Sequence, residues 1–313
     1  MIPVIDISSA VAGSADGRVV EQVRHAITDV GFFQVVGHGV PAGLVDAAYR
    51  AGWAFFAMDD DVKRMVADPH PFRGWSRPVT GARPVQQRFQ FCNVESAEDA
   101  RSRGIAETFF DYFTPNRWPE QIDLRAALWP YVSALQPVAG AIMSLFARVL
   151  DLDPGFFDQH LVHQVSCFAV NHYEGAARDG DDITALVEHR DSGTLTVLHQ
   201  RGDYAGLRVM LRDGTRMLVP VREDAFVINI GELMARWTND RFYATPHGVI
   251  LPEDARAKRT SLTLFHLPSV DVEIAPLPST VGAEGPRYEP ITPYLWERQF
   301  LARSYGEDWR ADG

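Results

Sequence analysis

The chain has 313 residues, of which 46% are hydrophobic and 23% charged, and its net charge is −11. This composition is ordinary for a globular protein with a large core, whereas the acidic balance argues against nucleic acid or an anionic membrane as a main partner. No apolar run reaches the roughly 18 residues of a membrane span, and the N-terminus has no signal-peptide pattern. With only two cysteines, Cys92 and Cys167, a disulfide is left open and a cytoplasmic location is expected.

Helices dominate the predicted N-terminal part. Residues 2–7 alternate as in a short strand, and apolar side chains recur at steps of three and four in a helix predicted at 16–29. Aromatic and β-branched residues then predict a strand at 32–36. A proline suited to the first helical turn begins a second helix, which is predicted at 41–56.

Residues 58–121 are less regular and contain a loop rich in proline and glycine. A strand predicted at 87–94 follows this loop. Because side chains alternate between the two faces of a strand, we expect Arg88 on one face and Phe89 and Phe91 on the other.

The second half of the chain changes from helix to strand. A long amphipathic helix is predicted at 124–150, and the internal Pro130 and Pro137 predict a kink or a break in it. Several short β-rich segments follow at near-regular spacing, which is typical of an all-β sandwich or barrel: 165–173, 195–200, 207–211, 217–221, 225–230, 248–251 and 261–267. A final amphipathic helix is predicted at 293–305.

Two side chains with metal-binding chemistry stand just before one of these β-rich runs. His189 and Asp191 are one strand step apart, so in an extended segment they point to the same side and Arg190 points to the opposite side. One imidazole and one carboxylate can hold a metal ion together, but two ligands make a weak site. The segment therefore predicts a metal site only if another part of the chain supplies a third ligand.

The β-rich half contains four distant histidines that could supply it, namely His172, His199, His247 and His266. His247 is the best candidate, because it enters a predicted strand directly after a turn. Two histidines and one carboxylate form a facial triad that leaves up to three metal positions open, as in non-haem Fe(II) oxygenases. A zinc ion with water in a fourth position would also fit these ligands.

Arg259 and Ser261 favour the oxygenase. They share one face of a predicted strand that follows His247. Arginine can clamp a carboxylate with two hydrogen bonds, and the serine hydroxyl adds another. A zinc hydrolase needs no carboxylate clamp beside its metal, whereas an oxygenase that consumes a dicarboxylic keto acid does.

With these residues the chain resembles the isopenicillin N synthase-like family of Fe(II)/2-oxoglutarate-dependent oxygenases. Besides the His-x-Asp, distant His and Arg-x-Ser motifs, the likeness includes residues 2–6, 31–41, 116–119, 226–232 and 237–240. The resemblance implies that His189, Asp191 and His247 bind Fe(2+) and carry catalysis. It also implies that Arg259 and Ser261 bind the distal carboxylate of 2-oxoglutarate.

The family's Asn-x-Tyr motif matches Asn171 and Tyr173. By resemblance, Tyr173 helps to hold the same carboxylate and Asn171 reaches the keto-acid end. The implied fold is mainly β with flanking helices, a distorted double-stranded β-helix (jelly-roll) core with N-terminal helices packed on it. One oxygenase domain is expected over 1–313, with an N-terminal helical and mixed region at 1–120, the core with the metal site at 160–270 and a C-terminal helix at 290–313.

The implied reaction uses O2 and 2-oxoglutarate, releases succinate and CO2, and hydroxylates, desaturates or cyclises a small-molecule metabolite, with secondary metabolism as the expected setting. The family region that usually lines the substrate pocket contains Arg73, Arg88, Phe89 and Phe91 as candidates. Arginines in this region favour an anionic or carboxylate-bearing substrate. Gly248, where the family often has a larger residue, is expected to leave room in the pocket.

Two other functions stay open. An oxidase of the same family would use iron and O2 without 2-oxoglutarate, and the Arg-x-Ser motif occurs there too, although the pair of Asn171 and Tyr173 favours the 2-oxoglutarate enzyme. A non-catalytic binding protein on this fold would be expected to lack a metal ligand, and all three are present. Arg190 departs from the small or polar residue usual between the two ligands, and it should face away from the metal.

Overall fold

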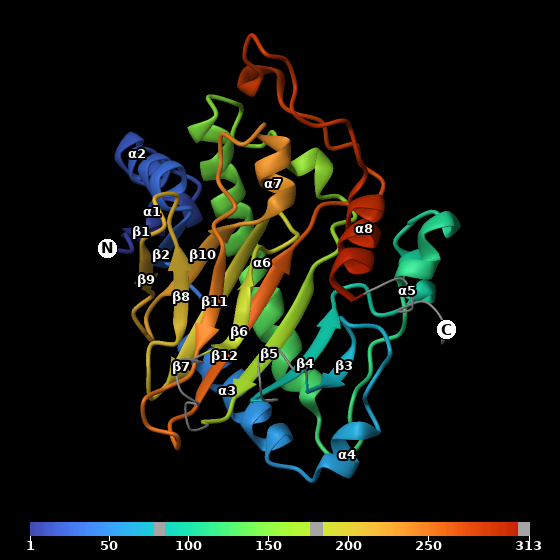
Figure 1. Ribbon diagram of the computed structural model, residues 1–313. Coiled ribbons are helices and arrows are strands. Elements are labelled where there is room, and N and C mark those ends of the chain that lie inside the picture. Colours follow the sequence, from blue (N-terminus) through green and yellow to red (C-terminus); the bar gives the residue numbers. More distant parts are fainter. Residues whose placement is uncertain (78–84, 176–183, 306–313) are drawn as a thin grey trace.

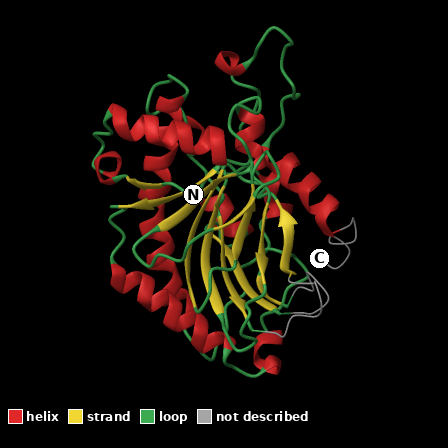
Figure 2. Ribbon diagram, turned by 60° about the vertical axis from the view of Figure 1, so that its left-hand side comes forward, coloured by secondary structure: helices red, strands yellow, loops and turns green. Residues whose placement is uncertain are grey.

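The computed structural model describes residues 1–77, 85–175 and 184–305. Its core consists of two β-sheets with a cavity between them, flanked by helices (Figures 1 and 2). The larger sheet has the strand order β1 (Val4–Asp6), β2 (Phe32–Val36), β10 (Phe226–Ile230), β7 (Leu195–Gly202), β12 (Arg259–His266), β5 (Cys167–Tyr173), β4 (Gln86–Cys92) and β3 (Gly74–Ser76). The smaller sheet has the order β6 (Thr184–His189), β11 (His247–Ile250), β8 (Leu207–Met210) and β9 (Arg216–Leu218).

The order of the strands is that of a double-stranded β-helix. From β5 onward the chain passes repeatedly between the sheets, with β5, β7, β10 and β12 in the larger one and β6, β8, β9 and β11 in the smaller one. Side chains on the inner faces of both sheets therefore converge on the space between them. The predicted jelly-roll core is confirmed, and each β-rich segment predicted from the sequence forms a strand.

The helices at Gly17–His25, Ala42–Phe56 and Leu124–Val149 pack on the outer face of the larger sheet and share one apolar core with it (Figure 1). The helices are α1 (Ser8–Val11), α2 (Gly17–His25), α3 (Ala42–Phe56), α4 (Asp60–Arg64), α5 (Ala97–Ser102), α6 (Leu124–Val149), α7 (Glu232–Trp237) and α8 (Pro293–Tyr305), with short helical segments of other pitch at Ala26–Val30, Glu107–Tyr112, Asp158–His160 and Pro278–Thr280. The C-terminal helix has the bounds predicted at 293–305, and the part of the expected C-terminal region from 306 to 313 lies outside the described residues. Asp16 caps α2, because its carboxylate accepts from the Val19 N–H at 2.9 Å.

α6 is the central helix of the core. Its apolar stripe, which includes Leu128, Leu135 and Ile142, is fully buried and lies against β7 and β12. The helix runs without interruption through Pro130 and Pro137, so of the kink or break that was expected the break is absent. The packing of the stripe compensates for the two missing N–H donors. By length and composition α6 could also cross a membrane, but 61% of its most apolar window is buried inside the protein, as expected for a core helix.

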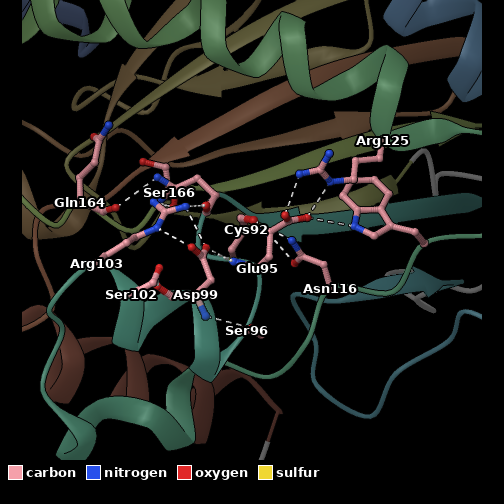
Figure 3. A network of polar contacts seen from close by, with 12 residues as sticks. Cys92, Glu95, Ser96, Asp99, Ser102, Arg103, Asn116, Arg125, Gln164 and Ser166 are labelled. Atoms are coloured by element: carbon pink, nitrogen blue, oxygen red, sulfur yellow. Dashed lines mark hydrogen bonds and ion pairs between the residues drawn. The ribbon is translucent and has the colours of Figure 1, made fainter.

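Polar side chains fix the irregular segment that follows β4 (Figure 3). The Asn116 side chain accepts from the Cys92 N–H at 3.0 Å and donates to the Cys92 carbonyl at 2.8 Å. Arg125 forms a two-pronged ion pair with Glu95 at 2.9 and 2.8 Å, and Asp99 accepts from the Glu95 N–H at 2.9 Å. These contacts hold the end of β4, a strand that also contributes residues to the cavity wall.

The two cysteines face each other at the same end of the larger sheet. Cys92, the last residue of β4, is paired in register with Cys167, the first residue of β5, and their Cα atoms are 4.1 Å apart. The structure joins them in a disulfide, a pairing that the sequence had left open.

Gly31 connects the N-terminal helices to the half of the chain that carries the metal site. It ends the helical segment with a left-handed φ of 71°, and the Thr245 hydroxyl donates to the Val30 carbonyl next to it at 2.6 Å. A Cβ at Gly31 would meet the Thr245 hydroxyl and would lie 2.6 Å from the Tyr243 carbonyl oxygen. Any side chain at this position would therefore displace the segment that leads into β11.

We expect Gly31→Ala to lower the free energy of unfolding by about 2 kcal/mol or more, because left-handed backbone strain and a backbone clash add up. Gly140→Ala is the matched control: it lies in α6, and an added Cβ meets no atom within 4 Å. The control should stabilise the protein by roughly 0.5–1 kcal/mol through helix propensity. Urea unfolding measures both variants, and equal changes would contradict the role assigned to Gly31.

Candidate active site

Three side chains that can bind a metal ion come together at one end of the smaller sheet, where β6 ends and β11 begins. β6 and β11 pair antiparallel with His189 directly opposite His247, and the centres of the two imidazole rings are 4.5 Å apart. Asp191, two residues beyond the end of β6, places its Oδ1 3.7 Å from His189 Nε2 and 3.6 Å from His247 Nε2. Among the described residues these three form the one group of His, Cys, Asp or Glu side chains close enough to share a metal ion.

Hydrogen bonds to the backbone orient both imidazoles. His189 Nδ1 lies 2.9 Å from the Val187 carbonyl, and His247 Nδ1 lies 3.0 Å from the Thr245 carbonyl. A carbonyl oxygen can only accept, so each Nδ1 carries the proton and each Nε2 presents its lone pair toward Asp191. This is the tautomer that a metal ligand needs.

Two polar side chains from the larger sheet orient Asp191. Its Oδ2 accepts from the Thr196 hydroxyl at 2.5 Å and from Asn229 Nδ2 at 2.8 Å, and these two residues are paired in register across β7 and β10. Oδ1 is left to face the histidines. Neither residue was identified from the sequence, although Asn229 is a polar residue inside an otherwise apolar strand, which is a signal that could have found it.

The protonation states of His189 and Asp191 suit metal binding. Burial, with a smaller contribution from the neighbouring His247, lowers the pKa of His189 to about 4, so that His189 is neutral near pH 7. Burial alone would raise the pKa of Asp191, but His247, His189 and the hydrogen bond from Thr196 hold it well below its usual range. A neutral imidazole and an ionised carboxylate are the forms that bind a cation. Asp191 in turn raises the pKa of His247 against the effect of burial.

A cavity of about 680 Å³ lies between the sheets and contains all three candidate metal ligands in its wall. The strand register arranges its polar lining in rows, because residues paired across neighbouring strands point to the same side. One row runs through Gln86, Tyr173 and Arg259, and the next through Arg88, Asn171 and Ser261. Apolar side chains from the smaller sheet, including Leu186, Leu207 and Val249, form the opposite wall.

Arg259 is the largest fully buried polar side chain of the cavity, with 1% exposure. Its Nε and Nη2 donate to Gln200 Oε1 at 3.4 and 3.0 Å, and its guanidinium carbon lies 5.2 Å from the centre of the Tyr173 ring. Its Nη1 has no hydrogen-bond partner, and no ion pair of Arg259 is found in the described parts of the chain. An unsatisfied buried guanidinium nitrogen indicates a site for an anionic ligand.

The other predicted cosubstrate residues lie beside Arg259. Asn171 Nδ2 lies 3.5 Å from the Ser261 hydroxyl and 3.3 Å from the Thr263 hydroxyl. The side-chain oxygen of Asn171 accepts from Gln86 at 3.0 Å. Thus Asn171, Ser261, Tyr173 and Arg259 are brought to one wall of the cavity that also contains the metal ligands.

Of the four substrate candidates, Arg88 alone lines the cavity. Phe89 and Phe91 point to the other face of β4 and pack in the core, where Phe89 contacts Phe55 and Phe91 contacts Phe168 at centroid distances of 5.0 and 5.3 Å. Their assignment to the substrate pocket is wrong, because the outer face of β4 is covered by helices.

Arg73 is also misassigned to the pocket. Its side chain is buried behind β4 and donates to the carbonyls of Thr114 and Phe72 and to the sulfur of Cys92. Gly248 does not enlarge the pocket either: a Cβ there would lie 2.6 Å from the Leu186 carbonyl of the neighbouring strand. Gly248 therefore permits the close approach of β6 and β11.

Arg190 points away from the other two side chains of its segment, as the alternation predicts. Its Nε donates to the Ala244 carbonyl at 2.8 Å and so ties the ligand segment to the chain that leads into β11. The remaining histidines of the β-rich half are engaged elsewhere, with His172 bonded to Thr260, His199 to Tyr49 and His266 to Thr194.

The donor set fits a non-haem iron. Two imidazole nitrogens and one carboxylate oxygen converge from one side, and the other side opens to the cavity. The carboxylate and both rings have the supporting hydrogen bonds that metal ligands usually have. The same three ligands can hold zinc, but Arg259 in the same cavity has no role in a zinc hydrolase.

Comparison with known proteins gives the same result. The family model described as non-haem dioxygenase in morphine synthesis N-terminal matches residues 2–121, and the 2OG-Fe(II) oxygenase superfamily model matches residues 164–268. The second range contains the candidate metal ligands and the cosubstrate residues.

Relatives match the chain over most of its length. Gibberellin 20 oxidase 3 of Oryza sativa subsp. japonica is 30% identical over 98% of this chain and 83% of its own. Validamycin A dioxygenase of Streptomyces hygroscopicus subsp. limoneus is 28% identical over 90% and 80%. A full-length Neurospora crassa protein, solved in complex with alpha-KG and thymine, shares the fold with a TM-score of 0.83 at 21% identity and 97% coverage of both chains. The chain thus belongs to the isopenicillin N synthase-like superfamily of 2OG-Fe(II) oxygenases and is a 2-oxoglutarate-dependent dioxygenase.

Proposed function

We propose that His189, Asp191 and His247 hold the Fe(2+) of this dioxygenase and that Arg259 binds the distal carboxylate of 2-oxoglutarate. The observation that carries the proposal is the unpaired Nη1 of Arg259 in the cavity that also contains the three metal ligands. Leaving a buried guanidinium without an anion is unfavourable. A dicarboxylate that reaches the metal with one end and Arg259 with the other satisfies both sites.

The neighbouring side chains complete the cosubstrate site in this proposal. Tyr173 and Ser261 lie beside Arg259 at the distal carboxylate, and Asn171 lies nearer the keto-acid end. Iron and 2-oxoglutarate, when bound, supply the oxidising chemistry with O2, so the chain itself has to bind, orient and exclude water. The apolar wall formed by Leu186, Leu207 and Val249 serves the last of these purposes.

We infer a small-molecule metabolite as the primary substrate, with secondary metabolism as its setting. The cavity of about 680 Å³ is in the usual range for such ligands, and names of relatives refer to validamycin A and gibberellin. The oxidase that works without 2-oxoglutarate is not favoured, because the chain matches the 2OG-Fe(II) oxygenase superfamily model and a relative of 28% identity is named a dioxygenase. The cytoplasmic location stays a prediction.

Succinate formation tests the proposal. The protein is purified anaerobically, loaded with Fe(II) and assayed for O2-dependent succinate from 2-oxoglutarate over a substrate panel. We expect His189→Ala to reduce the rate more than about a hundredfold, since even a supporting partner of a ligand is typically worth 10–100-fold. Uptake of O2 without succinate would favour the oxidase, and an unchanged rate in His189→Ala would refute the metal site.

Replacing Arg259 should separate the two binding sites. We expect Arg259→Ala to raise the 2-oxoglutarate concentration needed for half-maximal rate roughly 10–100-fold, because a hydrogen bond to a charged group is worth about 1.5–3 kcal/mol. The Kd for Fe(II) should stay within about twofold. Arg256→Ala, whose side chain is 91% exposed, is the matched control and should change neither quantity. An equal loss of affinity for 2-oxoglutarate and for Fe(II) in Arg259→Ala would contradict separate binding sites for the two ligands.

Removing a partner of Asp191 should weaken metal binding while the cosubstrate clamp stays intact. Asn229→Ala deletes one of the two hydrogen bonds to Oδ2, so we expect the Kd for Fe(II) to rise about 10–100-fold. Thr196→Val deletes the other bond and should act in the same direction. Metal titration by calorimetry measures both. Two folded variants with the affinity of the natural protein would show that Asp191 needs no such support.

A further inference from the structure

A side chamber of about 110 Å³ extends from the metal ligands to the C-terminal helix. Six residues line both this chamber and the main cavity, whereas Arg259 lines the main cavity alone: Arg88, Gln90, His189, Asp191, Phe265 and Phe300. The volume is sufficient for several non-hydrogen atoms. Much of its wall is apolar and consists of Phe72, Phe265, Leu267 and Phe300. A group bound here would thus lie beside the metal ligands without touching the cosubstrate clamp.

Glu297 of α8 is a buried carboxylate in the wall of this chamber. It has 2% exposure, and its Oε1 has no hydrogen-bond partner among the residues that the structure describes. Burial raises the pKa of Glu297 to about 7, with repulsion from Glu232 adding to the effect and a hydrogen bond with Ser192 opposing it. The helix is held in place because Trp296 Nε1 donates to the Ser192 carbonyl at 2.8 Å. Nothing in the metal or cosubstrate site explains why a carboxylate is buried here.

Two further polar atoms of the chamber have no partner. Within the described ranges, Gln90 Oε1, on the inner face of β4, accepts no hydrogen bond, and Arg88 Nε, two residues earlier on the same face, donates none. The chamber therefore offers two unpaired acceptors and, in Arg88, a cation with an unpaired donor. A second cation, Arg190, also lines the chamber, and its Nε donates to the Ala244 carbonyl. Because its walls are largely apolar, hydrogen bonds to these atoms are stronger than in water.

We propose that the primary substrate is an amino acid, or a close derivative with a free amino group and a free carboxylate, whose ammonium group donates to Glu297 and Gln90 and whose carboxylate binds Arg88. The inference rests on the proposed function, because it assigns the substrate of that site. An ammonium group carries only donors and matches the two acceptors, and a guanidinium matches a carboxylate. Arg88 lines both spaces, so the rest of the substrate extends into the main cavity beside the metal ligands.

The same contacts predict which analogues are rejected. An N-acetyl group removes the charge and two of the amino protons, so that Glu297 stays buried and unpaired. An amide in place of the carboxylate leaves Arg88 without its anion. Sites built around buried polar groups discriminate strongly against ligands that leave those groups unpaired.

The test measures binding without turnover. The natural protein is loaded anaerobically with Fe(II) and 2-oxoglutarate, and calorimetric titrations follow with leucine, proline and phenylalanine, each beside its N-acetyl derivative and its amide. We expect at least one free amino acid to bind, and we expect the affinity for each of its two derivatives to be at least tenfold lower. No binding by any free amino acid, or equal binding of the N-acetyl derivative, would overturn the proposal.

Variants then test the two residues separately. Glu297→Gln should lower the affinity for the free amino acid at least tenfold. The affinity for the amide of the same amino acid should fall by a similar factor, since both carry the ammonium group. Arg88→Gln should lower the affinity for the free amino acid at least tenfold and leave the affinity for the amide nearly unchanged. Glu284→Gln and Arg50→Gln, both at exposed positions, are the matched controls. Amino-acid affinity unchanged in Glu297→Gln would overturn the role of Glu297.

Failure of the proposed function would be visible separately. Titration of 2-oxoglutarate into the Fe(II) protein, before any amino acid is added, reports on the metal and cosubstrate site alone. If 2-oxoglutarate does not bind, the proposed function fails whatever the amino acids do. If it binds normally and every free amino acid fails, only the substrate inference is overturned. Normal 2-oxoglutarate binding in Glu297→Gln shows that a loss of amino-acid binding does not come from misfolding.

Discussion

The antiparallel pairing of β6 with β11 is the constraint on which the site depends. It sets His189 opposite His247, two residues that are far apart in the chain, and leaves Asp191 to join them from the end of β6. Each imidazole is then rotated by a bond to a carbonyl two residues before it, so backbone geometry decides where the lone pairs point. The close approach of the two strands in turn requires Gly248, because any side chain there would meet the backbone of β6.

Alternation along single strands was enough to predict much of the site. It predicted that Arg259 and Ser261 share one face of a strand. It also predicted that Arg190 lies on the opposite face from the metal ligands, and Arg88 on the opposite face from the two phenylalanines of β4. Alternation says which residues share a face, but not which face lies inside the jelly roll. Phe89 and Phe91 were expected in the pocket because their segment usually lines it in the family, whereas helices cover their side of the sheet.

Other features depend on contacts between distant segments and could not be predicted from local pattern. Asn229 supports Asp191 only because β10 lies beside β7 in a particular register. Glu297 reaches the side chamber only because α8 packs against the segment that follows the ligands. The helix around Pro130 and Pro137 is continuous because tertiary packing outweighs a local penalty, which single-sequence propensity does not contain.

The bond from Trp296 to the Ser192 carbonyl joins α8 to the residue directly after Asp191. Local opening of α8 has to break this bond, and with it a restraint on the metal-binding segment. Any ligand that holds this segment in place therefore protects the backbone amides of α8 against exchange with solvent. By reciprocity, the free energy by which metal binding stabilises α8 equals the free energy by which ordering of α8 strengthens metal binding.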